Sequence, residues 1–180
     1  MTDEEQELIS ACKRKDPLAQ KKLYELYAPK MLVVCRRYMG SQAAAEDVFH
    51  DGFVKVLTKI GSFQGNSSIY TWIRTIMVHT ALNALRANAV SRKYSEETAE
   101  VINDIQSDEI IFSRFTAKEL LAAIQSLPEM YRTIFNMREV EGFEYAEIAS
   151  QMKMTESYTR VCLARAKAML RKKLESDYGD

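Results

Sequence analysis

The chain has 180 residues with 25 Lys or Arg and 25 Asp or Glu, so its formal net charge is zero. Hydrophobic residues make up 47% of the sequence, and there are six Gly and three Pro, which favours an all-α globular protein over a β-sandwich or a disordered chain. No apolar run approaches the roughly 18 residues of a membrane-spanning helix. The N-terminal stretch "MTDEEQEL" is acidic, unlike a signal peptide. We therefore expect a cytoplasmic protein without membrane insertion.

Three cysteines, Cys12, Cys35 and Cys162, lie far apart in the sequence. Their odd number and their spacing do not fit a disulfide framework or a zinc site. We expect reduced thiols, no bound metal and no cofactor.

Charge is distributed unevenly along the chain. Residues 1–90 carry 12 basic and 9 acidic residues, residues 91–112 carry 2 and 6, and residues 113–180 carry 11 and 10. Within the last region, Lys153–Lys173 holds seven basic residues and one acid, Glu156. Such local segregation is typical of a nucleic-acid-binding surface.

Apolar residues recur every three or four positions in the first 90 residues, which predicts helices. The first helix is predicted to end near Asp16–Pro17. The second has Leu23, Leu26 and Tyr27 on one face, and at Pro29 the chain is expected to begin a new helix. After a break at "GS", the stretch "AAAEDVFHDGFVKVLTKI" predicts another helix. The turn-forming loop "GSFQGNSS" then precedes a helix in "IYTWIRTIMVHTALNALR".

Residues 91–112 lack a sustained apolar stripe and are predicted to form an acidic linker between two small helical domains, 1–90 and 113–180. A surface loop within one domain is the alternative, although roughly 20 structureless residues are unusual inside a compact domain. Helix is predicted to resume over Phe112–Ser126. Pro128 is expected at the first position of the following helix, where proline is favoured.

Two helices joined by a tight connection follow near the C-terminus. The first is predicted over Tyr145–Met152, with Ala149 where crossing helices need a small side chain. Thr155 is placed to cap the second. A short helix, a turn of three or four residues and a longer basic helix together indicate a helix-turn-helix that docks in the DNA major groove.

A projection at about 100° per residue separates two faces of the second helix. The predicted inner face consists of Thr159, Cys162, Leu163, Ala166 and Leu170. The predicted groove-facing side holds small and basic residues, namely Ser157, Arg160, Val161, Ala164, Arg165 and Ala168. Basic residues that flank it and extend beyond it suit phosphate contacts: Lys167, Arg171, Lys172 and Lys173. An amphipathic helix with a solvated basic face is the alternative interpretation.

The ordered motifs "AEDVFHDGFVKVL", "TWIR" and "LPEMYRTIFNMREVEGFEYAEIA" resemble those of bacterial RNA polymerase sigma factors of the extracytoplasmic-function (ECF) type. The resemblance covers most of both predicted domains. It implies a sigma factor, not an enzyme, whose first domain reads and melts the −10 promoter element and whose second reads the −35 element. It also implies three partners: core RNA polymerase (its clamp coiled coil and flap), promoter DNA and an anti-sigma factor.

The resemblance further implies roles for individual residues. Contacts with core polymerase are carried over to Asp47, His50, Asp51, Phe53 and Lys55. Contacts with the −10 element are carried over to Gln64, Asn66, Ser67, Ser68, Trp72, Arg74, His79 and Arg86, and Trp72 is equally interpretable as core. Contacts with the −35 element are carried over to Glu156, Ser157, Arg160, Val161, Ala164, Arg165, Lys167 and Arg171. The sequence departs from the family pattern at His50-Asp51, Lys153 and Val161-Cys162.

Two other functions compete with this interpretation. A helix-turn-helix regulator that acts without polymerase accounts for residues 142–173 but gives no role to "AEDVFHDGFVKVL". A metal-dependent enzyme would draw ligands from Glu46, Asp47, His50 and Asp51. That site needs a second acid-x-x-His motif on a facing helix, and the other histidine, His79, has no acid near it.

Overall fold

The computed structural model describes residues 2–90 and 114–178. The chain divides into two compact units, residues 1–93 and 94–180, which are treated separately below. Both units are helical, and the described ranges contain no β-strand, so the all-α prediction is confirmed. The predicted acidic linker, residues 91–112, lies outside the described residues.

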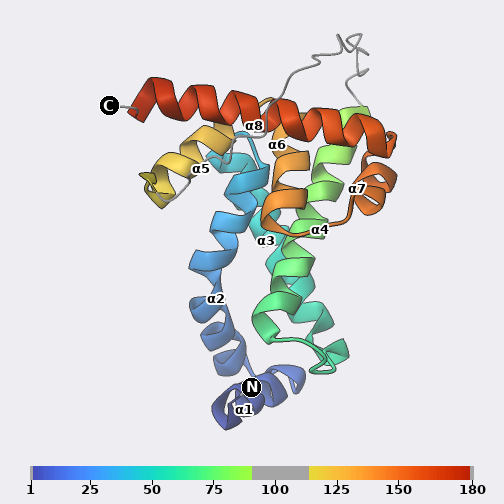
Figure 1. Ribbon diagram of the computed structural model, residues 1–180. Coiled ribbons are helices and arrows are strands. Elements are labelled where there is room, and N and C mark those ends of the chain that lie inside the picture. The colour runs from blue at the N-terminus through green and yellow to red at the C-terminus, as the bar shows by residue number, and fades with distance from the viewer. Residues whose placement is uncertain (1, 91–113, 179–180) are drawn as a thin grey trace. The chain divides into compact units, whose positions relative to one another are not determined.

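Unit 1 is a bundle of three long helices with a short helix at one end. The long helices α2, α3 and α4 pack on one another, while α1 packs on α2 and on the short η1 turn (Figure 1). The elements are α1 (Asp3–Lys13), α2 (Pro17–Tyr38), α3 (Gln42–Lys59), the 3₁₀ turn η1 (Ile60–Ser62) and α4 (Ile69–Val90).

Local chemistry fixes where the helices of unit 1 begin. The side chains of Thr2, Asp16 and Ser41 each accept a hydrogen bond from a backbone N–H in the first turn of α1, α2 and α3. Pro17 occupies the first turn of α2, where its missing N–H costs nothing. These caps explain the sharp breaks before α2 and α3.

The prediction of a new helix at Pro29 is wrong, because α2 continues through it. Pro29 is exposed, so water can solvate the carbonyl that loses its helical partner. Leu23 and Met31 are fully buried on either side and hold both halves of α2 in the core. Leu26, expected beside Leu23, is 51% exposed instead.

Close approach of α3 and α4 shapes the core of unit 1. A Cβ at Gly52 would overlap the sulfur of Met77, so any larger residue at position 52 would displace the Met77 side chain. All three long helices contribute fully buried residues to the core of this unit, and these include Tyr38, Val56, Ile69 and Ile73.

Unit 2 consists of one long helix with three shorter ones packed along it. The long helix α8 (Glu156–Tyr178) contacts α5 (Ala117–Ser126), α6 (Glu129–Phe135) and α7 (Tyr145–Met152) (Figure 1). A π-helical turn, η3 (Asn136–Val140), continues α6.

The predicted helix-turn-helix is present as α7 and α8, and α7 has the predicted bounds. Lys153 forms the turn in the left-handed conformation (φ 55°), and the Thr155 hydroxyl accepts from the Tyr158 N–H at 3.2 Å. Two boundaries upstream were predicted incorrectly. Helix α5 begins at Ala117, because a capping box between Thr116 and Glu119 starts it there, and Pro128 is the N-cap of α6 and not its first residue.

A buried arginine joins α5 to α6. Arg132 is 5% exposed, and its guanidinium donates to the carbonyls of Gln125 (3.0 Å) and Leu127 (3.2 Å) at the end of α5. Burial lowers the pKa of Arg132, and the neighbouring Glu129 acts in the opposite direction. The arginine of the "LPExxR" motif is therefore structural, since it satisfies carbonyls that the helix itself leaves unpaired.

Candidate nucleic-acid and polymerase interfaces

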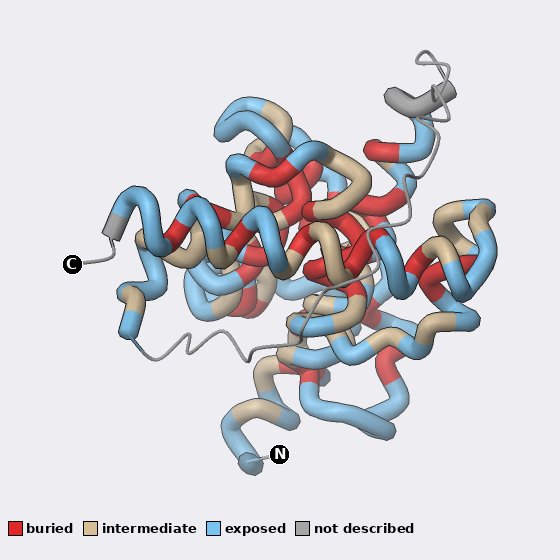
Figure 2. Tube along the Cα trace, turned by 45° about the horizontal axis from the view of Figure 1, so that its top comes forward, coloured by how far each residue is buried: buried red, intermediate tan, exposed pale blue. Residues whose placement is uncertain are grey.

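The two faces predicted for α8 are largely observed. All five residues of the predicted inner face are at most 4% exposed: Thr159, Cys162, Leu163, Ala166 and Leu170. Along α8 buried and exposed residues alternate with the helical turn (Figure 2). Ser157, Arg160, Val161 and Ala168 are exposed, and Ala164 is half-buried. Apart from Arg160, the exposed residues of this surface have short side chains: Ser157, Val161 and Ala168.

Arg160 is the most accessible cation on this surface. Its guanidinium carbon lies 3.9 Å from the centroid of the Tyr145 ring on α7. Its Nη2 lies 3.6 Å from the Glu156 carboxylate one turn earlier, and both side chains are more than half exposed. Exposed pairs of this kind contribute little stability, so Arg160 can exchange Glu156 for another acceptor.

Arg138 and Glu144 form a cluster with Tyr145, Glu156 and Arg160. Arg138 donates to the Phe143 carbonyl at 2.8 Å and to the Glu144 carboxylate at 3.1 Å, and its guanidinium carbon lies 4.6 Å from the Tyr145 ring centroid. Sequence analysis assigned no role to Arg138, Glu144 or Tyr145. These contacts join η3, α7 and α8, and no periodic pattern encodes them.

The prediction that Arg165 points away from the other helices is wrong. Arg165 is half-buried, and a hydrogen bond with Tyr131 on α6 raises the pKa of its guanidinium, while burial acts in the opposite direction. The helical projection places the Cα atom, but a long side chain can fold back onto a neighbouring helix. A role of Arg165 in base recognition stays a prediction.

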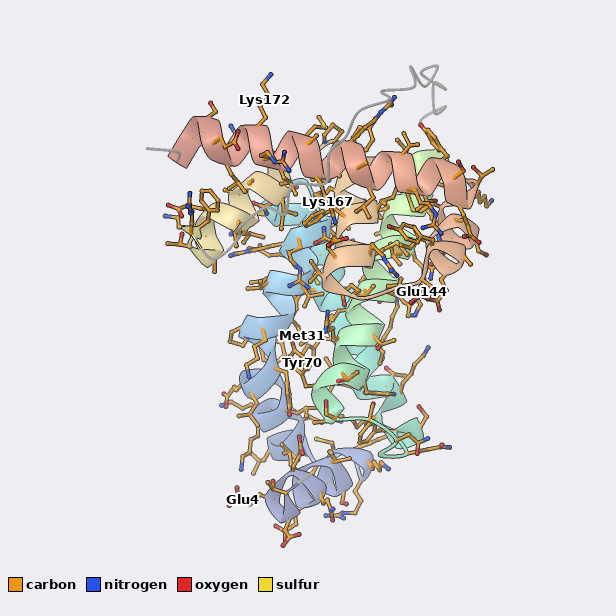
Figure 3. The ribbon with its side chains drawn as sticks, in the orientation of Figure 1. Glu4, Met31, Tyr70, Glu144, Lys167 and Lys172 are labelled. Carbon is orange, nitrogen blue, oxygen red and sulfur yellow. The ribbon has the colours of Figure 1, made fainter. Side chains whose placement is uncertain are left out.

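The predicted phosphate ligands differ in how they are engaged. Lys167 forms an ion pair with Glu139 on η3 at 2.9 Å, and Lys173 pairs with Asp177 at 2.9 Å. Arg171 is half-buried. Lys172 is exposed and extends from the side of α8 that faces away from the other helices of its unit (Figure 3).

In unit 1 the loop between η1 and α4 presents the polar residues predicted for −10 recognition. Gln64, Asn66, Ser67 and Ser68 are all exposed. Asn66 donates to the Gln64 side chain at 3.3 Å, and Ser68 accepts from the Thr71 N–H at 3.1 Å, so that it caps α4. The Ser68 hydroxyl is therefore engaged by the helix, whereas the Ser67 hydroxyl donates to the Ser68 carbonyl within the loop at 3.3 Å.

Helix α1 supports this loop. The Lys13 ammonium donates to the Phe63 carbonyl at 2.7 Å, and Phe63 itself is buried. A shallow hollow of about 480 Å³ lies between α1 and the loop, with Gln6, Ser10 and Gln64 among its lining residues. Anchoring by Lys13 fixes the base of the loop and leaves its tip open to solvent.

The predicted melting helix, α4, places its candidates in different environments. Trp72 is half-buried, and its ring lies 5.5 Å from that of Phe63, so it is partly core and partly accessible. Arg74 is half-buried, and His79 and Arg86 are exposed. Arg86 donates to the Asn83 side chain at 3.0 Å.

The predicted polymerase-binding face of α3 is only partly formed as expected. Asp47, His50 and Asp51 are exposed together. Phe53 is not on this face, because it is 3% exposed and packs edge-to-face on Tyr24 with centroids 4.8 Å apart. Lys55 is half-buried and donates to Thr80 of α4 at 3.3 Å.

These two corrections have one geometric reason. Phe53 is six residues after Asp47, which places it about 120° around the helix from it, and Lys55 is displaced by about 80°. Val54, 64% exposed, occupies the position beside the carboxylates. We call the following four residues the acidic face of α3: Asp47, His50, Asp51 and Val54.

Neither a metal site nor a membrane span is found in the described part of the chain. No group of three or more His, Cys, Asp or Glu in residues 2–90 and 114–178 is arranged to hold a metal ion. No helix in those ranges is long and apolar enough to cross a bilayer. The three cysteines are unpaired and buried.

Both units match known protein families. Sigma-70 region 2 matches residues 23–90, and Sigma-70, region 4 matches residues 117–170. The RNA polymerase sigma-H factor of Pseudomonas aeruginosa is 31% identical over 96% of this chain and 95% of its own length. The ECF RNA polymerase sigma-E factor of Haemophilus influenzae is 29% identical over 95% of each.

Two solved structures share the fold. The sigma factor RpoE from Bartonella quintana, in complex with the anti-sigma factor NepR, has a TM-score of 0.51 and 19% identity, and the match covers 87% of this chain and 97% of that one. CnrH in complex with the cytosolic domain of CnrY has a TM-score of 0.50 and 14% identity, with 97% and 99% covered.

Proposed function

Because the chain belongs to the sigma-70 family and is an alternative sigma factor of the ECF type, we propose that its two units recognise different promoter elements. Unit 2 reads the −35 element through the exposed side of α8. Unit 1 reads and melts the −10 element through the loop that contains Gln64, Asn66 and Ser67. The chain has no catalytic step of its own and acts in the cytoplasm with core polymerase.

The observation that carries this proposal is the outer surface of α8. It offers small residues flanking one exposed guanidinium, that of Arg160, on the second helix of a helix-turn-helix whose first helix is the short α7. The guanidinium of Arg160 is able to donate two parallel hydrogen bonds to guanine N7 and O6, which is the commonest specific contact in the major groove. Lys172, an exposed cation in the C-terminal half of α8, suits a phosphate contact.

We propose that the acidic face of α3 binds the clamp coiled coil of core polymerase. Two carboxylates and an exposed apolar Val54 favour a basic partner surface with an apolar centre. The polymerase flap is the proposed partner of unit 2, as the family resemblance implies.

An anti-sigma factor is the proposed inhibitory partner. The sigma factor RpoE of Bartonella quintana, which shares this fold, was solved in complex with the anti-sigma factor NepR. In this chain α2 exposes Leu18, Leu26 and Val33, which are 79%, 51% and 42% accessible. Several exposed apolar side chains on one helix favour the binding of a protein partner there.

Transcription with purified core polymerase tests the proposal. The full chain should direct promoter-specific start sites from a library of bacterial promoter fragments, and core polymerase alone should not. Arg160→Ala should reduce binding to the selected −35 sequence by roughly 1–3 kcal/mol, whereas Lys172→Ala should weaken binding to selected and scrambled sequences alike. Specific DNA binding without any association with core polymerase would favour the polymerase-independent regulator instead.

A further inference from the structure

Tyr145 has no role in the function proposed above, although its ring lies against Arg160, the arginine proposed to read the −35 element. Tyr145 is the first residue of α7, and its ring contacts the guanidinium groups of two arginines from other elements. The guanidinium carbon of Arg160 lies 3.9 Å from the ring centroid, and that of Arg138 lies 4.6 Å from it. Both distances are within the range of about 6 Å in which a cation is attracted to an aromatic ring.

The two arginines are held very differently. The side chain of Arg138 is 28% exposed and is fixed by the Phe143 carbonyl and the Glu144 carboxylate. Arg160 is 58% exposed, and its one charged partner within residues 114–178 is Glu156 at 3.6 Å, which is itself half exposed. Arg138 therefore anchors the ring, and the ring in turn supports the guanidinium of Arg160.

Support of this kind matters for a base-reading arginine. A free arginine side chain loses rotamer entropy when it binds a base, and this loss is smaller when the guanidinium is already held in place. A ring that contacts the guanidinium leaves its N–H groups free to donate in the guanidinium plane. An arginine presented in this way can form both bonds to the O6 and N7 acceptors of guanine.

We infer that Tyr145 is a specificity-determining positioning residue, whose ring holds Arg160 in the orientation that recognises a guanine of the −35 element. The inference rests on the proposed function, because it requires α8 to lie in the major groove. Glu156 completes the arrangement by neutralising Arg160 until DNA replaces it. Tyr145 then sets the choice of base more than the overall affinity.

The test uses the full chain bound to core polymerase and duplexes randomised over the upstream promoter element. Selection and sequencing give the base preference at each position for the wild type, Arg160→Ala, Tyr145→Leu and Tyr145→Phe. Arg160→Ala identifies the position that Arg160 reads. Tyr145→Leu should lower the guanine preference there by roughly fivefold, which corresponds to one exposed cation–π contact, and should leave the other positions unchanged. Tyr145→Phe keeps the ring and should keep the preference.

The matched variants separate the alternatives. If Tyr145→Leu retains the guanine preference while Arg160→Ala loses it, the positioning role is wrong and the proposed function stands. If Tyr145→Phe loses as much as Tyr145→Leu, the hydroxyl and not the ring is responsible, and the inference is likewise wrong. If Arg160→Ala changes no position, the proposed base reader itself fails. Circular dichroism on each variant excludes loss of folding, because a misfolded unit 2 would weaken every position equally.

Discussion

Replacing the buried Arg132 by methionine should destabilise unit 2 while leaving unit 1 unchanged. The change removes two charged hydrogen bonds, to Gln125 at 3.0 Å and to Leu127 at 3.2 Å, and leaves two carbonyls at the end of α5 without their donor. Hydrogen bonds to charged groups each contribute about 1.5–3 kcal/mol. Methionine fills most of the volume and removes the cost of burying a charge, so we expect a net loss of about 3 kcal/mol.

The single tryptophan of the chain makes this loss measurable one unit at a time. Trp72 lies in unit 1, so its fluorescence follows the unfolding of that unit in urea, whereas far-ultraviolet circular dichroism follows both. A loss of about 3 kcal/mol is more than half the roughly 5 kcal/mol that a small unit holds. The dichroism should therefore show an early transition, and the fluorescence midpoint should stay where it is in the wild type.

Arg132→Lys is the matched control. It keeps the charge but lacks the rigid fork that bridges two carbonyls, so its loss should lie between those of the wild type and the methionine variant. A dichroism midpoint that is unchanged in Arg132→Met would show that Arg132 does not hold α5 to α6. A fluorescence midpoint that falls equally would show that the effect is not local to unit 2.

Three further predictions concern unit 1. Gly52→Val should lower the free energy of unfolding by roughly 1–3 kcal/mol in the Trp72 fluorescence assay, because its side chain would collide with Met77, whereas Gly61→Val, with open space around it, should have little effect. Burial raises the pKa of the Cys35 thiol from 9.0 to about 12. Between these values the unfolded chain loses the proton that the folded chain keeps. Stability should therefore fall from pH 9 to 12, by up to about 1.4 kcal/mol per pH unit, and less steeply in Cys35→Ala, while equal slopes would contradict this assignment. Asp51→Asn should weaken core polymerase binding about fivefold at low salt, while Asp3→Asn, the same charge change on α1, should not; equal effects would argue against the acidic face of α3.

Helix boundaries with a local chemical signal were predictable from the sequence. The bounds of α7 and the inner face of α8 follow from periodicity and from Thr155, because both depend on residues near in sequence. Phe53 was wrongly assigned to the exposed face of α3, because a residue six positions after Asp47 lies about 120° around the helix from it. Pro29 was misjudged because burial of Leu23 and Met31 outweighs one missing hydrogen bond.

The candidate site was predictable only in outline. Arg160 was identified from its position on the basic helix, and the structure places it as expected on the exposed side. Its neighbour Tyr145 is fifteen positions earlier, and the contact depends on how α7 crosses α8. Arg165 and Lys167 were expected to face DNA, yet both side chains contact residues of α6 or η3. Contacts of long side chains between helices have no periodic signal in sequence.

The ion pairs that basic residues of α8 form within unit 2 affect how DNA binding responds to salt. Of the seven basic residues in Lys153–Lys173, Arg160, Lys167 and Lys173 already face a carboxylate of the same unit. On binding DNA, a cation paired in this way must first give up its carboxylate. The freed carboxylate then takes up a cation from solution, which offsets part of the counterion release from the phosphates. Counterion release per basic residue is then smaller than the count of seven suggests, so the logarithm of affinity should fall less steeply with the logarithm of salt concentration. We therefore expect the free chain to bind arbitrary DNA weakly and to find promoters as part of the complex with polymerase.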